Sequence, residues 1–117
     1  MAFEISKTYA FEAAHSLPFL PEFHKCHHLH GHSYKITIKV RGNELNSQHM
    51  VTDFAELDAC MAPLIDKLDH QNLNNHFPCT TSEYLAKAIF KLLGNDLPGL
   101  SEVEVKETEK TGAKYCA

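Results

Sequence analysis

Hydrophobic and polar residues alternate near the start of the chain in two segments. In residues 3–12, one face carries Phe3, Ile5, Tyr9 and Phe11 while the other face is polar, which predicts a half-buried strand. Residues 34–41 alternate more regularly and predict a second strand. This second strand places Tyr34, Ile36, Ile38 and Val40 on its apolar face, and it is expected to end at Gly42-Asn43.

Two amphipathic helices are predicted in the middle of the chain. Asp53 with Glu56 has the form of a capping box, and apolar residues follow at helical spacing as far as Leu68. Pro63 lies inside this helix and is expected to kink it or to weaken its middle turn. A second capping signature, Thr80-Thr81-Ser82-Glu83, opens another amphipathic run that Gly94 is expected to end.

The end of the chain returns to strand character. Val103 and Val105 alternate with charged residues, and Glu107 continues the apolar side of that alternation, which places a carboxylate in a row that should face the core. After Thr111-Gly112, residues 113–116 form a short partner strand. The element order ββααββ predicts an α+β domain over residues 1–117, with an antiparallel four-stranded sheet covered on one face by two helices.

Composition and charge exclude several classes of protein. The chain has 44% hydrophobic and 22% charged residues and a net charge of −4, without a stripe of Lys or Arg, which argues against a nucleic-acid binder. It has no apolar run long enough to span a bilayer and no signal-peptide pattern, so a cytoplasmic location is expected. The four cysteines form no CxxC pair and are interpreted as free thiols.

Histidines cluster in the long connection between the first two predicted strands. Of the nine in the chain, six fall between His15 and His32. In an extended segment His30 and His32 point to the same face, and Gly31 lets a metal or ligand approach the backbone. A catalytic zinc takes three protein ligands and keeps its fourth position open. We predict a zinc site with His15 as the third ligand; His24, His27 and His28 compete for that role, and His27 and His28, being adjacent, supply at most one ligand.

Cys26 lies in this histidine-rich loop and allows three interpretations. Free cysteine is commonly a small buried hydrophobic residue. Near a cation the thiolate would be stabilised, so Cys26 could act as a base or nucleophile. As a fourth zinc ligand it would instead close the site and make it structural.

Three further segments carry candidate chemistry. Asp69-His70 follows the first helix: a carboxylate beside an imidazole suits proton transfer, although a helix C-terminus also favours His. The hydroxyls of Thr80 to Ser82 are explained by capping and remain compatible with a functional role. Glu107 at an apolar strand position needs a partner, which could be an internal Arg or Lys or a ligand that carries two donors, such as an aminopyrimidinone edge.

As a set, these segments resemble the 6-pyruvoyltetrahydropterin synthase family over residues 3–115. The order and spacing are shared by Phe11-Glu12-Ala13-Ala14-His15, Cys26-x-x-x-His30-Gly31-His32, Asp53-Phe54, Leu68-Asp69-His70, Thr81-Ser82-Glu83 and Val105-Lys106-Glu107-Thr108. The resemblance is to the bacterial branch, the 6-carboxy-5,6,7,8-tetrahydropterin synthases of queuosine biosynthesis. It implies the tunnelling fold, in which trimers close their sheets into a barrel, and two trimers commonly stack into a hexamer with active sites at subunit boundaries.

The resemblance also implies a substrate and residue roles. The substrate would be 7,8-dihydroneopterin triphosphate, and the product 6-carboxy-5,6,7,8-tetrahydropterin, with release of acetaldehyde and triphosphate. His15, His30 and His32 match the zinc ligands, and Cys26 matches the catalytic thiol. Asp69 with His70 matches the proton-transfer pair, which can serve a neighbouring subunit. Glu107 matches the carboxylate that anchors the pterin ring, beside Thr81 and Ser82.

The branch is indicated by the spacing of the thiol. Cys26 stands four residues before His30, whereas the pyruvoyl-forming enzymes carry a slightly longer segment there. His28 departs from the pattern, because bacterial relatives can carry arginine at this position. Two alternatives stay open: the pyruvoyl-forming reaction on the same substrate, and a non-catalytic zinc- or pterin-binding module.

Overall fold

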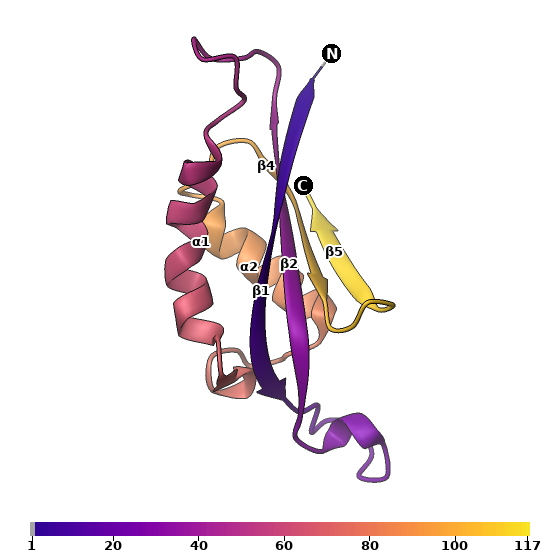
Figure 1. Ribbon diagram of the computed structural model, residues 1–117. Helices are drawn as coiled ribbons and strands as arrows, with labels where there is room; N and C mark the ends of the chain where they lie inside the picture. The colour runs from indigo at the N-terminus through magenta and orange to yellow at the C-terminus, as the bar shows by residue number, and fades with distance from the viewer. Residues whose placement is uncertain (1) are drawn as a thin grey trace.

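Two long antiparallel strands, β1 (Phe3–His15) and β2 (His30–Gly42), form the spine of the fold. The computed structural model describes residues 2–117, and it is elongated, with extents of 56 × 26 × 24 Å. Figure 1 shows both helices on one face of a twisted sheet, with the connection between β1 and β2 extending beyond one end of it. The α+β class and the placement of two helices on one face are confirmed.

The sheet has five strands, in the order β3-β1-β2-β4-β5, so the prediction of four strands was wrong. β4 (Leu100–Lys106) pairs antiparallel with β2, and β5 (Gly112–Cys116) pairs antiparallel with β4. The added strand, β3 (Gln71–Asn72), pairs parallel with β1 directly after the first helix, which makes the sheet mixed. A strand of two residues is too short to produce a periodic pattern in the sequence.

β1 and β2 are both longer than their hydrophobic alternation predicted. β1 continues through His15 and β2 already begins at His30, so the irregular connection is shorter than expected and contains a 3-10 turn, η1 (Lys25–His27). The register pairs His15 with His30 and Ala13 with His32. Backbone pairing therefore carries both strands into the histidine-rich segment, where side-chain alternation no longer marks them.

The helices begin and end at capping residues. α1 (Phe54–Leu68) begins after Asp53, whose side chain accepts a hydrogen bond from the Ala55 amide, and it continues through Pro63. α2 (Ser82–Leu93) ends at Gly94, as predicted, but its N-cap is Thr81. The capping signature starting at Thr80 was thus one residue early, because Thr80 is buried and contacts His15. A second 3-10 turn, η2 (Leu73–Asn75), lies between the helices.

The core lies between the sheet and the two helices. From β2 it takes Tyr34, Ile36 and Ile38, and from the helices it takes Leu57, Met61, Leu85 and Ile89, all at most 1% exposed. The same row of β2 continues outward to His32 and His30, and the buried row of β1 ends in His15. The face that forms the core therefore also presents the histidines at one end of the sheet. Among residues 2–117, no helix is both long and apolar enough to cross a bilayer.

The Thr81 cap is expected to contribute to the stability of the fold. Thr81 Oγ1 accepts a hydrogen bond from the Tyr84 amide at 3.2 Å. Thr81→Ala is expected to lower the free energy of unfolding by about 1 kcal/mol, because one amide of the first helical turn loses its partner. Urea denaturation at fixed protein concentration measures this change. Ser47→Ala, at an exposed position, is the control, and an equal loss in both variants would contradict the capping role.

Candidate metal centre

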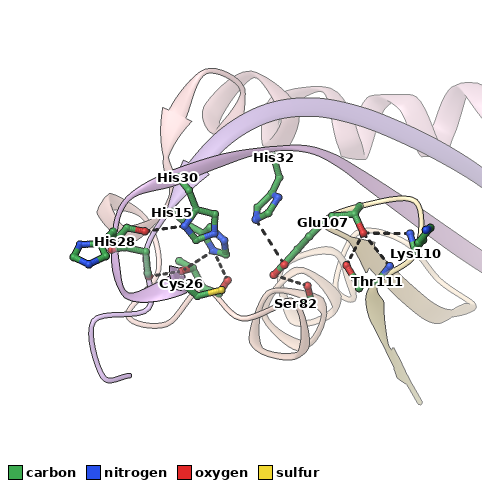
Figure 2. Close-up of polar contacts among 12 residues, drawn as sticks. His15, Cys26, His28, His30, His32, Ser82, Glu107, Lys110 and Thr111 are labelled. Atoms are coloured by element: carbon green, nitrogen blue, oxygen red, sulfur yellow. Dashed lines mark hydrogen bonds and ion pairs between the residues drawn. The ribbon is translucent and has the colours of Figure 1, made fainter. Parts of the chain in front are cut away.

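Three imidazoles meet at the end of β1 and β2. His15 stands opposite His30 in the register, and His32 points to the same face two residues further on. One ring nitrogen from each of the three lies within 4.8 Å of those of the other two, and the rings meet edge to face. Figure 2 shows these rings, with Ser82 and Glu107 beyond His32. Among residues 2–117, this is the group of His, Cys, Asp and Glu side chains that could hold a metal ion.

Hydrogen bonds to backbone carbonyl groups orient two of these rings. His15 Nδ1 lies 2.9 Å from the Thr80 carbonyl oxygen, and His30 Nδ1 lies 2.7 Å from the His28 carbonyl oxygen. A carbonyl only accepts, so each Nδ1 carries the proton and each Nε2 keeps its lone pair. Such a partner on the second ring nitrogen is typical of metal-binding histidines, since it fixes the tautomer.

Two buried ring nitrogens in the cluster have no hydrogen-bond partner within the described chain. They are Nε2 of His15 and Nε2 of His32. Burial lowers the pKa of both imidazoles, and the nearby Glu107 opposes this only in part. Neutral rings with free lone pairs are what a metal ion requires, and unpaired buried nitrogens are otherwise costly. The three side chains could therefore hold a metal ion, and their ligand group contains no fourth member within residues 2–117.

Lower pH is expected to destabilise the metal-free protein. The pKa of His15 and His32 is lower in the folded state than the ordinary value of 6.5, so below that value the unfolded chain binds more protons. The stability is fully present above about pH 6.5 and is lost as the pH falls through the folded pKa values. Thermal unfolding between about pH 8 and about pH 5 measures this loss. His32→Gln should flatten the profile, and an unchanged profile would contradict the assignment.

Glu107 lies directly after β4, beside the cluster. Its Oε1 accepts a hydrogen bond from Ser82 Oγ at 3.0 Å, and its Oε2 lies 3.7 Å from His32 Nε2. The side chain is 24% exposed, so it is neither fully buried nor in open solvent. Neither an Arg nor a Lys of the described residues pairs with it; the partner within the chain is Ser82, at the start of α2. The second hydroxyl of the segment, Thr81, is used in capping.

Cys26 lies in η1, at the same end of the sheet. Its amide donates to His24 Nδ1 at 3.0 Å and its carbonyl accepts from the Leu17 amide at 2.8 Å, so the backbone on both sides of the thiol is held. The thiol is partly exposed and is not a member of the ligand group found within residues 2–117. In Figure 2 it is drawn at the end of the cluster where His15 and His30 lie.

The other three histidines of the loop form hydrogen bonds with backbone groups of the loop itself. His27 Nδ1 lies 2.8 Å from the Leu20 carbonyl, and His28 Nε2 lies 3.0 Å from the Glu22 carbonyl. His24 accepts from the Cys26 amide. These three rings, which competed for the third ligand position, shape the connection that carries Cys26.

Asp69 and His70 are both hydrogen-bonded to Glu12 of β1. Asp69 Oδ1 accepts from the Glu12 amide at 2.9 Å and lies 3.0 Å from His70 Nδ1, and the amide hydrogen bond lowers the pKa of Asp69. The His70 side chain is 78% exposed, and its backbone has a positive φ of 59°. The two side chains contact each other, as a proton-transfer pair requires, and both lie outside the ligand group of the same chain.

Two contributors could not be found from the sequence. Thr80 orients His15 through its carbonyl, a contact across 65 positions that any residue could make with its backbone. Tyr34 is fully buried against the edges of His15 and His32, and its hydroxyl has no hydrogen-bond partner among the described residues. Burial, with the nearby Glu107 carboxylate, raises the pKa of Tyr34. Its place in the alternating row predicted only a core residue.

Comparison with known proteins decides the family. The family model for 6-pyruvoyl tetrahydropterin synthase matches residues 4–117. The chain belongs to this family. It is 41% identical to a Synechocystis protein named 6-carboxy-5,6,7,8-tetrahydropterin synthase, covering 95% of this chain and 91% of the relative. It is 34% identical to the Dictyostelium discoideum 6-pyruvoyl tetrahydrobiopterin synthase, covering 78% of this chain and 73% of the relative.

A solved structure from the same family supports the fold. The 6-pyruvoyl tetrahydropterin synthase of Caenorhabditis elegans superposes with a TM-score of 0.88 at 29% identity, covering all of this chain and 96% of the other. The family predicted from the sequence motifs is therefore confirmed. Relatives with both product names are found, so membership of the family does not by itself determine the product.

Proposed function

We propose that this chain is a zinc-dependent lyase of queuosine biosynthesis. It would convert 7,8-dihydroneopterin triphosphate to 6-carboxy-5,6,7,8-tetrahydropterin, with release of acetaldehyde and triphosphate. The observation that carries the proposal is the cluster of His15, His30 and His32. The Nε2 atoms of His15 and His32 are buried without a hydrogen-bond partner, and the absence of a fourth protein ligand within residues 2–117 suits a catalytic rather than a closed metal site. The similarity to the Synechocystis relative supports the carboxy-forming reaction.

In this proposal the three histidines hold the metal, and the rest of the chain handles the protons. When bound, zinc would lower the pKa of the substrate's side-chain hydroxyls and stabilise negative charge as protons move. The carbonyls of Thr80 and His28 keep the His15 and His30 rings in the required tautomer, so neither ring has to reorganise.

Cys26 is proposed as the base that removes a proton from the substrate side chain. A thiolate is favoured near a cation, and Cys26 is partly exposed and held at the metal end of the sheet by two backbone hydrogen bonds. Its absence from the ligand group supports a catalytic role over a fourth-ligand role. His70, hydrogen-bonded to Asp69, is proposed as the acid on the other side of the substrate.

Glu107 and Ser82 are proposed to anchor the pterin ring. A carboxylate accepts two parallel hydrogen bonds, which matches the donor pair on the aminopyrimidinone edge. Ser82 holds one carboxylate oxygen at 3.0 Å, and the other oxygen lies toward His32. Thr81 contributes indirectly in this proposal, because as the N-cap it fixes the start of the helix that carries Ser82.

The placement of Asp69 and His70 favours a site shared between subunits. The pair lies outside the ligand group of its own chain, and His70 is the most exposed of the proposed catalytic side chains. We therefore propose that it serves a neighbouring subunit in a trimer or a hexamer made of two trimers.

Metal removal tests the proposed chemistry. The zinc-loaded protein should release triphosphate from 7,8-dihydroneopterin triphosphate, the protein stripped by a chelator should not, and added Zn²⁺ should restore the rate. Turnover that persists with less than a few per cent of the metal remaining would refute the zinc dependence.

The pyruvoyl-forming reaction is the second candidate, supported by the similarity to the Dictyostelium relative. It would use the same metal ligands and the same anchor and would differ in the bonds broken in the side chain. The spacing of four residues from Cys26 to His30 favours the carboxy-forming reaction. A non-catalytic zinc- or pterin-binding module, the candidate of another class, would require Cys26 to be dispensable or to bind the metal.

A further inference from the structure

A cavity lies between the two helices. Its volume is about 620 Å³, within the range of small-molecule sites. Leu64 and Lys67 of α1, Lys87 and Lys91 of α2, and His76 of the connection between the helices are among the residues that line it. None of its lining residues belongs to the proposed metal and pterin site, so we call it the interhelical groove and consider it separately.

The interhelical groove concentrates positive charge on a chain whose net charge is −4. Lys67, Lys87 and Lys91 line it, and its lining contains no Asp or Glu. Among the described residues, these three lysines have no ion-pair partner, whereas Lys35 and Lys39 each pair with a glutamate. Lysines without an ion-pair partner, gathered around one cavity whose lining carries no acidic side chain, favour an anion.

The rest of the lining is mostly apolar. Phe77 and Leu68 are buried, and Tyr84 and Leu92 remain 40% and 56% exposed. His76 adds a polar atom: its Nε2 is buried and has no hydrogen-bond partner within residues 2–117. Large exposed apolar side chains beside an unsatisfied ring nitrogen indicate a surface that a ligand with both apolar and polar parts would cover.

We propose that the interhelical groove binds a small amphipathic anion. The ligand would have an aromatic or aliphatic body lying against Phe77, Tyr84 and Leu92, and a phosphate, sulfonate or carboxylate group held by the lysines. Lysine binds such groups as a compact point charge, and three lysines provide several donors at the rim. This inference is independent of the proposed pterin chemistry.

Titration with 8-anilinonaphthalene-1-sulfonate, an aromatic sulfonate, tests the proposal on the full chain without any pterin. The probe should bind at low ionic strength, and 0.5 M salt, at which the Debye length is about 4 Å, should weaken binding severalfold. Lys87→Gln with Lys91→Gln should raise the Kd about tenfold, since two charges near the sulfonate are lost. Leu92→Asn should also weaken binding, because it removes exposed apolar surface from the rim.

The matched control is Lys35→Gln with Lys106→Gln, which removes the same charge from the sheet face opposite the helices. This control should leave the Kd within about twofold of the unmodified protein. Its two lysines lie on the other face of the sheet from the interhelical groove, where charges separated from the ligand by water contribute little to binding. Equal weakening in both double variants would overturn the proposal, as would binding that is insensitive to salt or to Leu92→Asn. Because the readout is binding of this probe, a failure here would leave the lyase proposal untouched.

Discussion

Replacing Cys26 with alanine is expected to lower turnover at least about a hundredfold while zinc stays bound. The thiol is not a member of the group formed by His15, His30 and His32, so its loss leaves the metal ligands in place. If it is the base, its removal should lower kcat by about 10²- to 10⁴-fold. Steady-state release of triphosphate, with the zinc content of the same sample, measures both effects.

Cys79→Ala is the matched control for this experiment. Cys79 is likewise a free, partly exposed thiol, and it lies just before α2, where its sulfur is 3.8 Å from the Thr81 hydroxyl. This variant should keep both zinc and turnover. If Cys26→Ala instead lost its metal and its thermal stability together, the thiol would be a structural ligand and the binding-module interpretation would gain support.

Replacing His30 with alanine is expected to remove both the metal and the activity. Loss of a residue that only orients a ligand commonly weakens metal binding about 10- to 100-fold, so loss of a ligand itself should cost at least about 100-fold. His30 is partly exposed, unlike the buried His15, so its truncation should leave the fold intact. Zinc stoichiometry after dialysis, with circular dichroism as a check on folding, measures the outcome.

His28→Ala provides the comparison for His30. The His28 ring forms its hydrogen bond with the Glu22 carbonyl of the loop. The carbonyl that orients His30 belongs to the main chain of His28, so it is still present after the substitution. This variant should retain its zinc. If His28→Ala lost zinc as completely as His30→Ala, the third ligand would have been misassigned and His28 would be a member of the site.

Much of this architecture follows from side-chain periodicity. The alternation in residues 34–41 predicted the buried row of β2, and the capping residues Asp53 and Gly94 mark the ends of helices as expected. Glu107 was conspicuous because it interrupts an apolar row, and it does lie beside the histidines. These features were predictable because each depends on residues close together in the sequence.

Contacts between distant segments were not predictable in this way. β3 exists because Gln71 and Asn72 meet the end of β1, and two residues carry no pattern of their own. The N-cap of α2 is Thr81 and not Thr80, where the sequence signature began. Thr80 is buried against His15, and local capping rules do not include such a contact. The histidine cluster depends on the register of β1 with β2, which the side-chain pattern does not define. From the residues alone His15 was the predicted third ligand, but His24, His27 and His28 stayed open as competitors.

Identification of the product tests the central claim most directly. The zinc-loaded protein would be incubated with 7,8-dihydroneopterin triphosphate, and the pterin product would be analysed by mass spectrometry together with an assay for acetaldehyde. We predict 6-carboxy-5,6,7,8-tetrahydropterin and acetaldehyde in equal amounts. A 6-pyruvoyl product without acetaldehyde would contradict the carboxy-forming assignment, and unchanged substrate in the presence of bound zinc would contradict the lyase assignment altogether.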